Sequence, residues 1–128
     1  MRLLLDTHSF LWFIGGDKSL SAYARSLIED DDNEVFLSVA SLWEIAIKVS
    51  LGKLRLEQPF DLLIPQQLYV NNIELCAITV QHASVVATLP FHHRDPFDRL
   101  LIAQALVEQL LIIGHDQIFD AYAVQRIW

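Results

Sequence analysis

Short apolar runs alternate with longer segments of helical periodicity along most of this chain. Runs typical of buried strands lie at positions 2–5, 35–37, 74–78 and 110–113, with a weaker one at 126–128. Segments with apolar residues at helical spacing lie at 7–14, 21–30, 40–51, 59–71, 80–89 and 96–109. Strands and helices in alternation are typical of a parallel sheet covered by helices. The pattern therefore predicts the α/β fold class.

Composition agrees with a folded chain and narrows the possible chemistry. Hydrophobic residues make up 53% of the 128 residues, whereas disordered chains have too few apolar residues to bury a core. The chain has one cysteine, Cys76, so an intrachain disulfide and a cluster of thiolate zinc ligands are both excluded. The length is typical of one domain, and we expect a single domain over residues 1–128.

Charge and hydropathy set two further limits. The net charge is −7, whereas proteins that hold DNA through its phosphates need a cationic surface, so we expect no sequence-specific DNA binding. The opening apolar run stops at Asp6, short of a signal-peptide core. The apolar stretch at 100–113 is interrupted by Gln104, Glu108 and Gln109, and it is shorter than the roughly 20 residues that span a bilayer. We expect a cytoplasmic protein with no membrane segment.

Four acidic residues follow predicted strands or begin predicted helices. Asp6 comes directly after the first strand, and Asp116 comes shortly after the fourth. Glu44 lies two helical turns after the second strand, and Asp98 lies in the first turn of the last helix. Ligands of open parallel sheets bind where the carboxyl ends of the strands meet the helices that follow. We therefore expect all four side chains at one edge of the sheet.

A structural explanation exists for each acid taken alone. Asp6 is of the residue type that caps a following helix, and Asp98 lies in a first turn, where the helix dipole favours a negative charge. Ser41 and Glu44 have the spacing of a capping box, and Glu44 also makes a favourable i,i+4 pair with Lys48. Asp116, the last of the four acids, is of a residue type that is common in turns. For single residues, both the structural and the functional interpretation stay open.

Taken together, the acids indicate a bound cation. Clustered carboxylates repel one another, and without a cation this repulsion forces protons onto some of them. Mg²⁺ and Mn²⁺ prefer carboxylate and water oxygens as ligands. Asp95 is left out of the set, because it suits the cap of a helix that begins at Pro96. The predicted ligands of Mg²⁺ or Mn²⁺ are Asp6, Glu44, Asp98 and Asp116.

Four segments carry a longer pattern that spans nearly the whole chain. They read LLLDTH at 3–8, SLWEIAIK at 41–48 with LGKL at 51–54, HRDPFDRLLIAQA at 93–105, and DQIF at 116–119 followed by Tyr122. In this order they resemble the PIN-domain ribonucleases, and the match is closest to the VapC-type toxins of prokaryotic toxin–antitoxin pairs. The second and third segments are long enough to make the resemblance specific.

The resemblance implies a fold, an activity and two partners. The fold is a three-layer α/β/α sandwich with a central, mostly parallel sheet, and the four acids are its metal-binding residues. The activity is Mg²⁺- or Mn²⁺-dependent RNA cleavage by a metal-activated water, which leaves 5′-phosphate and 3′-hydroxyl ends. The partners are a second copy of the chain, in a homodimer, and an inhibitory VapB-type antitoxin. Gly114 departs from the family, which often has Thr or Ser two residues before the last acid.

An acidic protein needs local cations to attract RNA. Lys48, Arg94 and Arg99 lie close in sequence to the predicted acids and are candidates for RNA binding. The alternative is that they are solvated or paired within the protein, as exposed cations on helices often are. The histidines match no compact zinc motif, and we expect them at the surface or behind the metal ligands. Those near the acids are His8, His92, His93 and His115.

The apolar content also indicates a covered surface. An apolar share beyond the need of one small core is typical of a chain that buries a face against a partner. The first two predicted helices and residues 60–69 are the candidates for such a face.

Two alternative functions stay open at this point. One is a catalytically impaired PIN domain that serves as an RNA- or protein-binding module, and Gly114 is the feature that favours it. The other is a receiver-type signalling domain, which also gathers acids and a metal at its strand ends. That class needs a phosphoacceptor Asp at the end of a central strand and a Lys at the end of a later one. The third strand runs into Cys76, Ala77, Ile78 and Thr79 and has neither.

Overall fold

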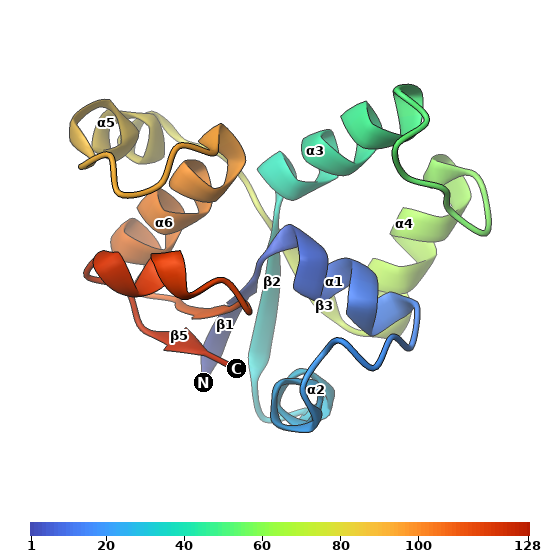
Figure 1. Cartoon of the computed structure of the whole chain (residues 1–128). Coiled ribbons are helices and arrows are strands. Elements are labelled where there is room, and N and C mark those ends of the chain that lie inside the picture. The colour runs from blue at the N-terminus through green and yellow to red at the C-terminus, as the bar shows by residue number, and fades with distance from the viewer.

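A five-stranded parallel sheet forms the centre of the computed structural model, which describes residues 1–128 (Figure 1). The strands are β1 (Arg2–Leu5), β2 (Glu34–Ser38), β3 (Ile73–Cys76), β4 (Leu111–Ile113) and β5 (Arg126–Ile127). Their order is β3-β2-β1-β4-β5, and every neighbouring pair is parallel. The predicted α/β class and parallel sheet are confirmed, and the weak run at the end of the chain is indeed a strand.

Helices cover both faces of the sheet and make three layers. They are α1 (Thr7–Ile14), α2 (Ala22–Glu29), α3 (Val39–Ser50), α4 (Phe60–Val70), α5 (Val80–Thr88), α6 (Pro96–Glu108) and the 3-10 helix η1 (Gln117–Ala121). Figure 1 shows α1, α2 and α4 on one side of the strands and α5 and α6 on the other. The ends of the predicted elements differ from the observed ones by at most two residues, and η1 is an addition to them. No helix combines the length and apolar character that crossing a membrane requires.

The core divides in two because side chains alternate along the central strand. Leu3 and Leu5 pack with α1, α2 and α3 on one face of the sheet, whereas Leu4 packs with α6 on the other. All three leucines are fully buried. Burial on both faces explains why β1 is a continuous apolar run instead of an alternating one.

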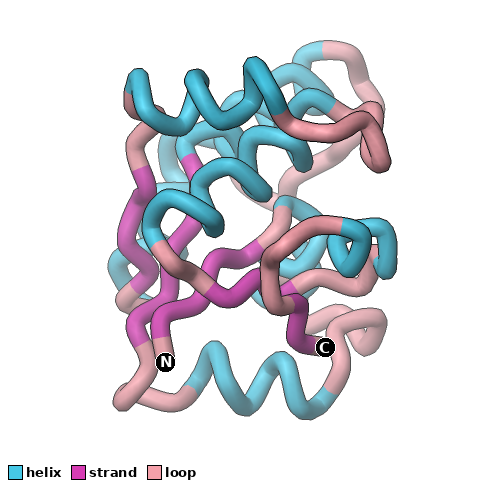
Figure 2. The backbone as a smooth tube through the Cα atoms, turned by 90° about the vertical axis from the view of Figure 1, so that its left-hand side faces the viewer, coloured by secondary structure: helices cyan, strands magenta, loops and turns pink.

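The order of the strands reverses at β1, and this decides where the site forms. β1 has β2 on one side and β4 on the other, with Leu5 in register with Ile113. The strands therefore bring Asp6, after β1, and Asp116, after β4, to the same edge of the sheet. Figure 2 shows the strands as neighbouring segments of the chain with helices around them. Crevices at such reversals are where ligands of open α/β sheets bind.

The cap of α3 differs from the prediction. Ser38, not Ser41, is the N-cap, and its hydroxyl accepts a hydrogen bond from the amide of Ala40 at 3.0 Å. The alternative that Ser41 and Glu44 form a capping box is therefore wrong, because both residues lie inside the helix and their side chains are buried. The two side chains are thus left for contacts with other elements.

The cap of α6 is the one predicted, and it has a measurable consequence. Asp95 Oδ1 accepts hydrogen bonds from the amides of Phe97 at 2.8 Å and Asp98 at 3.0 Å. We expect Asp95→Ala to lower the free energy of unfolding by about 0.5–2 kcal/mol, measured by urea denaturation, because it leaves these donors unpaired. The RNA cleavage that the resemblance implies is expected to persist at a permissive temperature. Asp31→Ala, in an exposed turn, is the control. Wild-type stability with complete loss of cleavage would instead place Asp95 in the catalytic machinery.

Candidate metal centre and active site

Asp6 is a buried carboxylate held by the start of α1. It is the N-cap of this helix, and its Oδ1 accepts a hydrogen bond from the amide of Ser9 at 2.8 Å. Burial raises the pKa of Asp6 above its ordinary value, and the hydrogen bonds from Ser9 oppose that shift only in part. The predicted cap is thus confirmed, but a cap is normally exposed to water. Only 6% of Asp6 is exposed, so its charge needs a further partner.

Gly114 makes room for the other oxygen of Asp6. A Cβ atom at position 114 would lie 2.8 Å from Asp6 Oδ2 and 3.2 Å from a ring carbon of Phe119. Both distances are shorter than ordinary van der Waals contacts, so a larger residue displaces the carboxylate or the ring. The family often has Thr or Ser at this position. The glycine found here leaves the space that Asp6 Oδ2 occupies.

Glu44 reaches the same edge from the second turn of α3. Its Oε1 accepts a hydrogen bond from the hydroxyl of Thr7 at 2.7 Å, and its Oε2 lies 3.0 Å from the ammonium of Lys48. The Thr7 hydroxyl is also 3.0 Å from the hydroxyl of Ser41. Sequence reasoning missed Thr7 and Ser41 as partners. The signals in the sequence were a hydroxyl residue directly after Asp6 and a second hydroxyl residue that precedes Glu44 by one helical turn.

Asp98 and Asp116 meet around the imidazole of His93. Asp98 lies in the first turn of α6, and its Oδ2 is 2.8 Å from His93 Nε2. Asp116 caps η1 by accepting a hydrogen bond from the amide of Ile118, and its Oδ2 is 3.8 Å from the same nitrogen. One ligand atom from each of these three residues lies within 4.8 Å of the others. Asp6 and Glu44 lie outside this tight group.

The pKa of Asp98 is raised to about 7. Burial is the main cause, and the charges of Asp95 and Asp6 add to it, while the hydrogen bond from His93 opposes it. The charge of Glu44 in turn raises the pKa of Asp6. Electrostatic coupling therefore runs from Glu44 through Asp6 to Asp98, although these carboxylates belong to three different helices.

The residues present fit a hard divalent cation. Carboxylate oxygens are the ligands that Mg²⁺ and Mn²⁺ prefer, and the pKa of Asp98 is raised first by burial and then by the charges of Asp95 and Asp6. A nearby cation would stabilise the ionised carboxylate against both effects. Lys48 already neutralises part of the charge of Glu44, so the buried Asp6 and the half-buried Asp98, whose pKa values are both raised, have the greater need of a counter-ion.

The expected RNA contact of Arg99 is corrected by the structure. Arg99 is 5% exposed, and its guanidinium donates hydrogen bonds to four backbone carbonyls. These belong to Val86, Leu89, Pro90 and His93. Asp98 and Arg99 are adjacent in sequence, but consecutive residues of a helix point about 100° apart. Arg99 therefore faces the loop before α6 instead of the solvent.

The two other candidate cations differ in whether they are paired with an acid. Lys48 is bound to Glu44, at the edge of the acid cluster. Arg94 is exposed, and no ion pair involves it. Arg94 stands one residue after His93, so its charge is free for a ligand that approaches Asp98.

Comparison with protein families agrees with this geometry. A family model described as PIN domain matches residues 3–125 of the chain. The chain belongs to the PIN domain family. Over 59 residues this PIN domain is 41% identical to Ribonuclease VapC16 of Mycobacterium tuberculosis, and the match covers 46% of this chain and 40% of that protein. The chain therefore matches less than half the length of this curated relative.

Solved structures show the same fold for the PIN domain. The structure of VapBC2 from Rickettsia felis, bound to a DNA fragment from the VapBC2 promoter, matches with a TM-score of 0.74 and 13% identity, over 99% of this chain and 98% of that one. VapBC-1 from nontypeable Haemophilus influenzae matches with a TM-score of 0.67 and 15% identity, over 99% and 97% of the chains.

Proposed function

We propose that this PIN domain is a metal-dependent endoribonuclease and the toxin of a toxin–antitoxin pair. The observation that carries the proposal is the group of coupled carboxylates at the edge where the strand order reverses, with Asp98 so desolvated that its pKa is about 7. Family membership and the likeness to a relative named as a ribonuclease support it. The test is cleavage of single-stranded RNA with Mn²⁺ and with EDTA.

The chain's own residues supply the binding and orientation that such a reaction needs. Asp6, Glu44, Asp98 and Asp116 would hold Mg²⁺ or Mn²⁺. A bound ion lowers the pKa of a water and offsets charge on the phosphodiester. Ser9 orients Asp6 through its amide, and Thr7 orients Glu44 through its hydroxyl. Arg94 offers local attraction for the RNA backbone, which an acidic protein otherwise repels.

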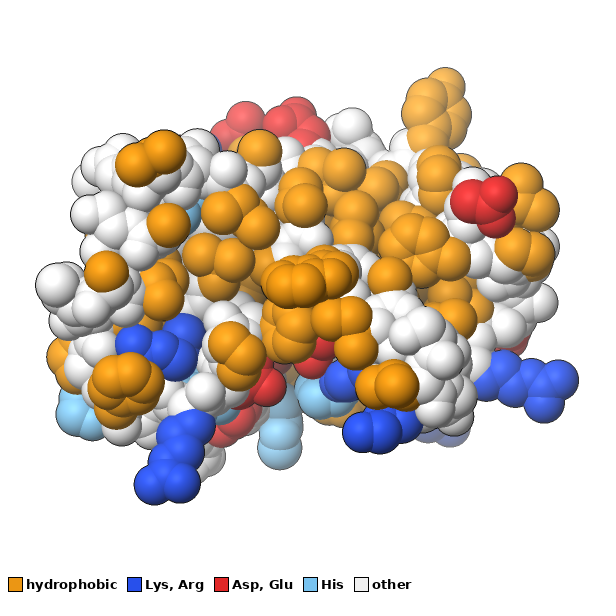
Figure 3. Space-filling model, turned by 90° about the horizontal axis from the view of Figure 1, so that it is seen from above, with side chains coloured by type: hydrophobic (Ala, Val, Ile, Leu, Met, Phe, Trp, Pro, Cys, Tyr) orange, Lys and Arg blue, Asp and Glu red, His pale blue; other side chains and the backbone are white.

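An apolar face over α3 and α6 supports the homodimer. Trp43 on α3 is 63% exposed. Its ring packs edge-on against Phe97 of α6, with 5.6 Å between the ring centres. Val39, at the start of α3, is also exposed. Figure 3, seen from above, shows hydrophobic side chains gathered over the face that carries these helices. Contiguous apolar patches of this kind mark association sites, and a second copy of the chain would cover it symmetrically.

The dimer makes a direct prediction. We expect Trp43→Glu to convert the protein to a monomer in sedimentation-velocity experiments, because a charge at the centre of an apolar interface is left without a partner. Tyr23→Glu is the matched control. Tyr23 is an aromatic residue 56% exposed on α2, which lies at the opposite end of the molecule from α3 in Figure 1. A wild-type protein that sediments as a monomer would contradict this assignment of the face.

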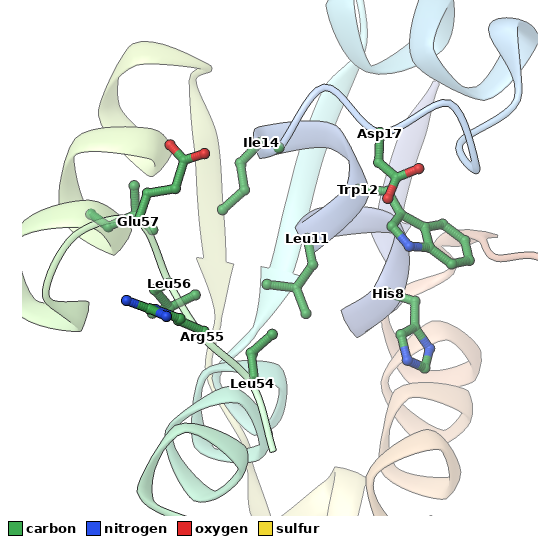
Figure 4. A pocket seen from close by; sticks show the side chains of 11 residues that line it. His8, Leu11, Trp12, Ile14, Asp17, Leu54, Arg55, Leu56 and Glu57 are labelled. Atoms are coloured by element: carbon green, nitrogen blue, oxygen red, sulfur yellow. The ribbon is translucent and has the colours of Figure 1, made fainter. Parts of the chain in front are cut away.

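A groove beside α1 fits a segment of a VapB-type antitoxin. It has a volume of about 370 Å³ and lies between α1 and residues 54–57. Figure 4 shows Leu11 of α1 and Leu54 pointing towards each other across it, with Arg55 and Glu57 at its rim. Apolar walls with charged residues at the rim suit an amphipathic segment. His8, which follows Asp6 by two residues, also lines the groove, so an occupant would lie near the start of α1.

A further inference from the structure

His93 has a position that neither the core nor a helix cap explains. Its side chain is 12% exposed, and Nε2 lies 2.8 Å from Asp98 Oδ2 and 3.8 Å from Asp116 Oδ2. The imidazole is thus the one side chain that forms a hydrogen bond or ion pair with both carboxylates. No other side chain donates a hydrogen bond to Asp98. What the ring does there depends on which of its nitrogens carries the proton.

The backbone decides the tautomer of the neutral ring. The amide N–H of Asp95 donates a hydrogen bond to His93 Nδ1 at 3.4 Å, and a nitrogen that accepts cannot also carry a hydrogen. The proton therefore lies on Nε2, which donates to Asp98. Binding a metal through Nε2 would require moving this proton to Nδ1, where it would face the amide hydrogen of Asp95. The geometry favours a hydrogen-bond donor over a metal ligand.

The loop that carries His93 is held from two sides. The guanidinium of Arg99 donates to the carbonyl of His93 at 3.2 Å and to that of Pro90 at 3.0 Å. The hydroxyl of Tyr122 donates to Pro90 at 2.7 Å and accepts from the amide of His93 at 2.8 Å. The imidazole also packs edge-on against Phe119, with 6.0 Å between ring centres. These contacts leave the ring little freedom to turn away from the acids.

We propose that His93 is a positioning residue that orients Asp98 and keeps it beside Asp116 for the cation. Its N–H occupies Oδ2 of Asp98 and leaves Oδ1 of that carboxylate for the metal. Groups that hydrogen-bond to metal ligands typically change metal affinity 10–100-fold when they are removed. The inference rests on the proposed metal centre, and it gives the buried Arg99 a role: that residue holds the loop that presents His93.

Mn²⁺ binding to the whole protein, measured by titration calorimetry at one fixed pH, tests the proposal. We expect His93→Ala to raise the Kd for Mn²⁺ about 10–100-fold. His93→Gln is expected to retain most of the wild-type affinity, because its amide N–H can take the place of Nε2–H. His92→Ala is the control: the ring of His92 packs on Tyr122 and makes no contact with a carboxylate. Melting of each metal-free variant shows that it is folded.

Three results would overturn the proposal and leave the metal centre standing. Equal Mn²⁺ affinity in His93→Ala and the wild type would show that the ring positions nothing. A nitrogen-14 nucleus bound directly to Mn²⁺, detected by pulsed electron paramagnetic resonance of the wild type and lost in His93→Ala, would make His93 a ligand instead of a donor. Equal losses in the Ala and Gln variants would count against a donor as well. A wild type that binds no Mn²⁺ would contradict the proposed metal centre itself, and this inference with it.

Discussion

Asp98→Asn is expected to lower the rate of RNA cleavage about 100-fold or more, because the lost ligand removes several kcal/mol of transition-state stabilisation. EDTA is expected to abolish cleavage by the wild type, and Mn²⁺ to restore it. Substitution of each further acid by its amide should also reduce cleavage severely. The amide variants of the further acids are Asp6→Asn, Glu44→Gln and Asp116→Asn. Single-turnover cleavage of a labelled single-stranded RNA measures the rate for each variant.

Asp95→Asn is the matched control for this series. It removes a carboxylate one helical turn from Asp98, but asparagine is as good an N-cap as aspartate, so α6 keeps its start. Cleavage by this variant is expected to stay near the wild-type rate. Undiminished wild-type cleavage in EDTA would contradict the metal mechanism. No cleavage by the wild type with Mn²⁺ would favour the alternative of an impaired PIN domain that only binds.

Mn²⁺ is expected to raise the melting temperature, and by more at pH 8 than at pH 6. An ion bound only by the folded state adds about 2.7 kcal/mol of stability at 100 times its Kd. The gain depends on pH because the pKa of Asp98 is about 7. Below that value the carboxyl group carries a proton, and the proton competes with the cation. Differential scanning calorimetry with Mn²⁺ and with EDTA at both pH values measures the effect.

The same pKa predicts the opposite trend when the metal is removed. In the folded protein Asp98 titrates at about 7, against 3.8 for an unperturbed aspartate. Between these values the folded state binds more protons than the unfolded state, so the contribution of Asp98 to stability falls as pH rises through this window. In EDTA, Asp98→Asn should remove this loss and melt no lower than the wild type at pH 8, while gaining less from Mn²⁺. A variant that melts lower in EDTA and keeps the full response to Mn²⁺ would make Asp98 a structural residue of the helix start.

The chemistry of the candidate site could be predicted from the sequence because its acids stand at places that local rules define. Asp6 directly follows a buried strand, and Asp98 follows a cap and a proline that start a helix. Parallel strands place their carboxyl ends at one edge whatever their order. The element types, the cap at Asp95 and the shared edge therefore follow from short-range patterns.

Other features depend on contacts between segments far apart in the chain. The placement of β4 beside β1 brings Gly114 against Asp6 and Asp116 towards Asp98. Sequence order alone does not state which strands are neighbours. Ser38, and not Ser41, caps α3, because the helix begins at Val39, directly after β2.

The sequence by itself determined which residue types are available at this edge, whereas only the tertiary structure decided what each of them contacts. Arg99 and His93 show the difference most clearly. An arginine beside Asp98 suggested an RNA contact, but the turn of the helix directs it into the loop before α6. A histidine in that loop suggested only a surface residue or one behind the ligands, but the hydrogen bonds from Arg99 and Tyr122 aim it at Asp98. The direction of a side chain in a loop depends on long-range packing, and that information exists only once the chain is folded.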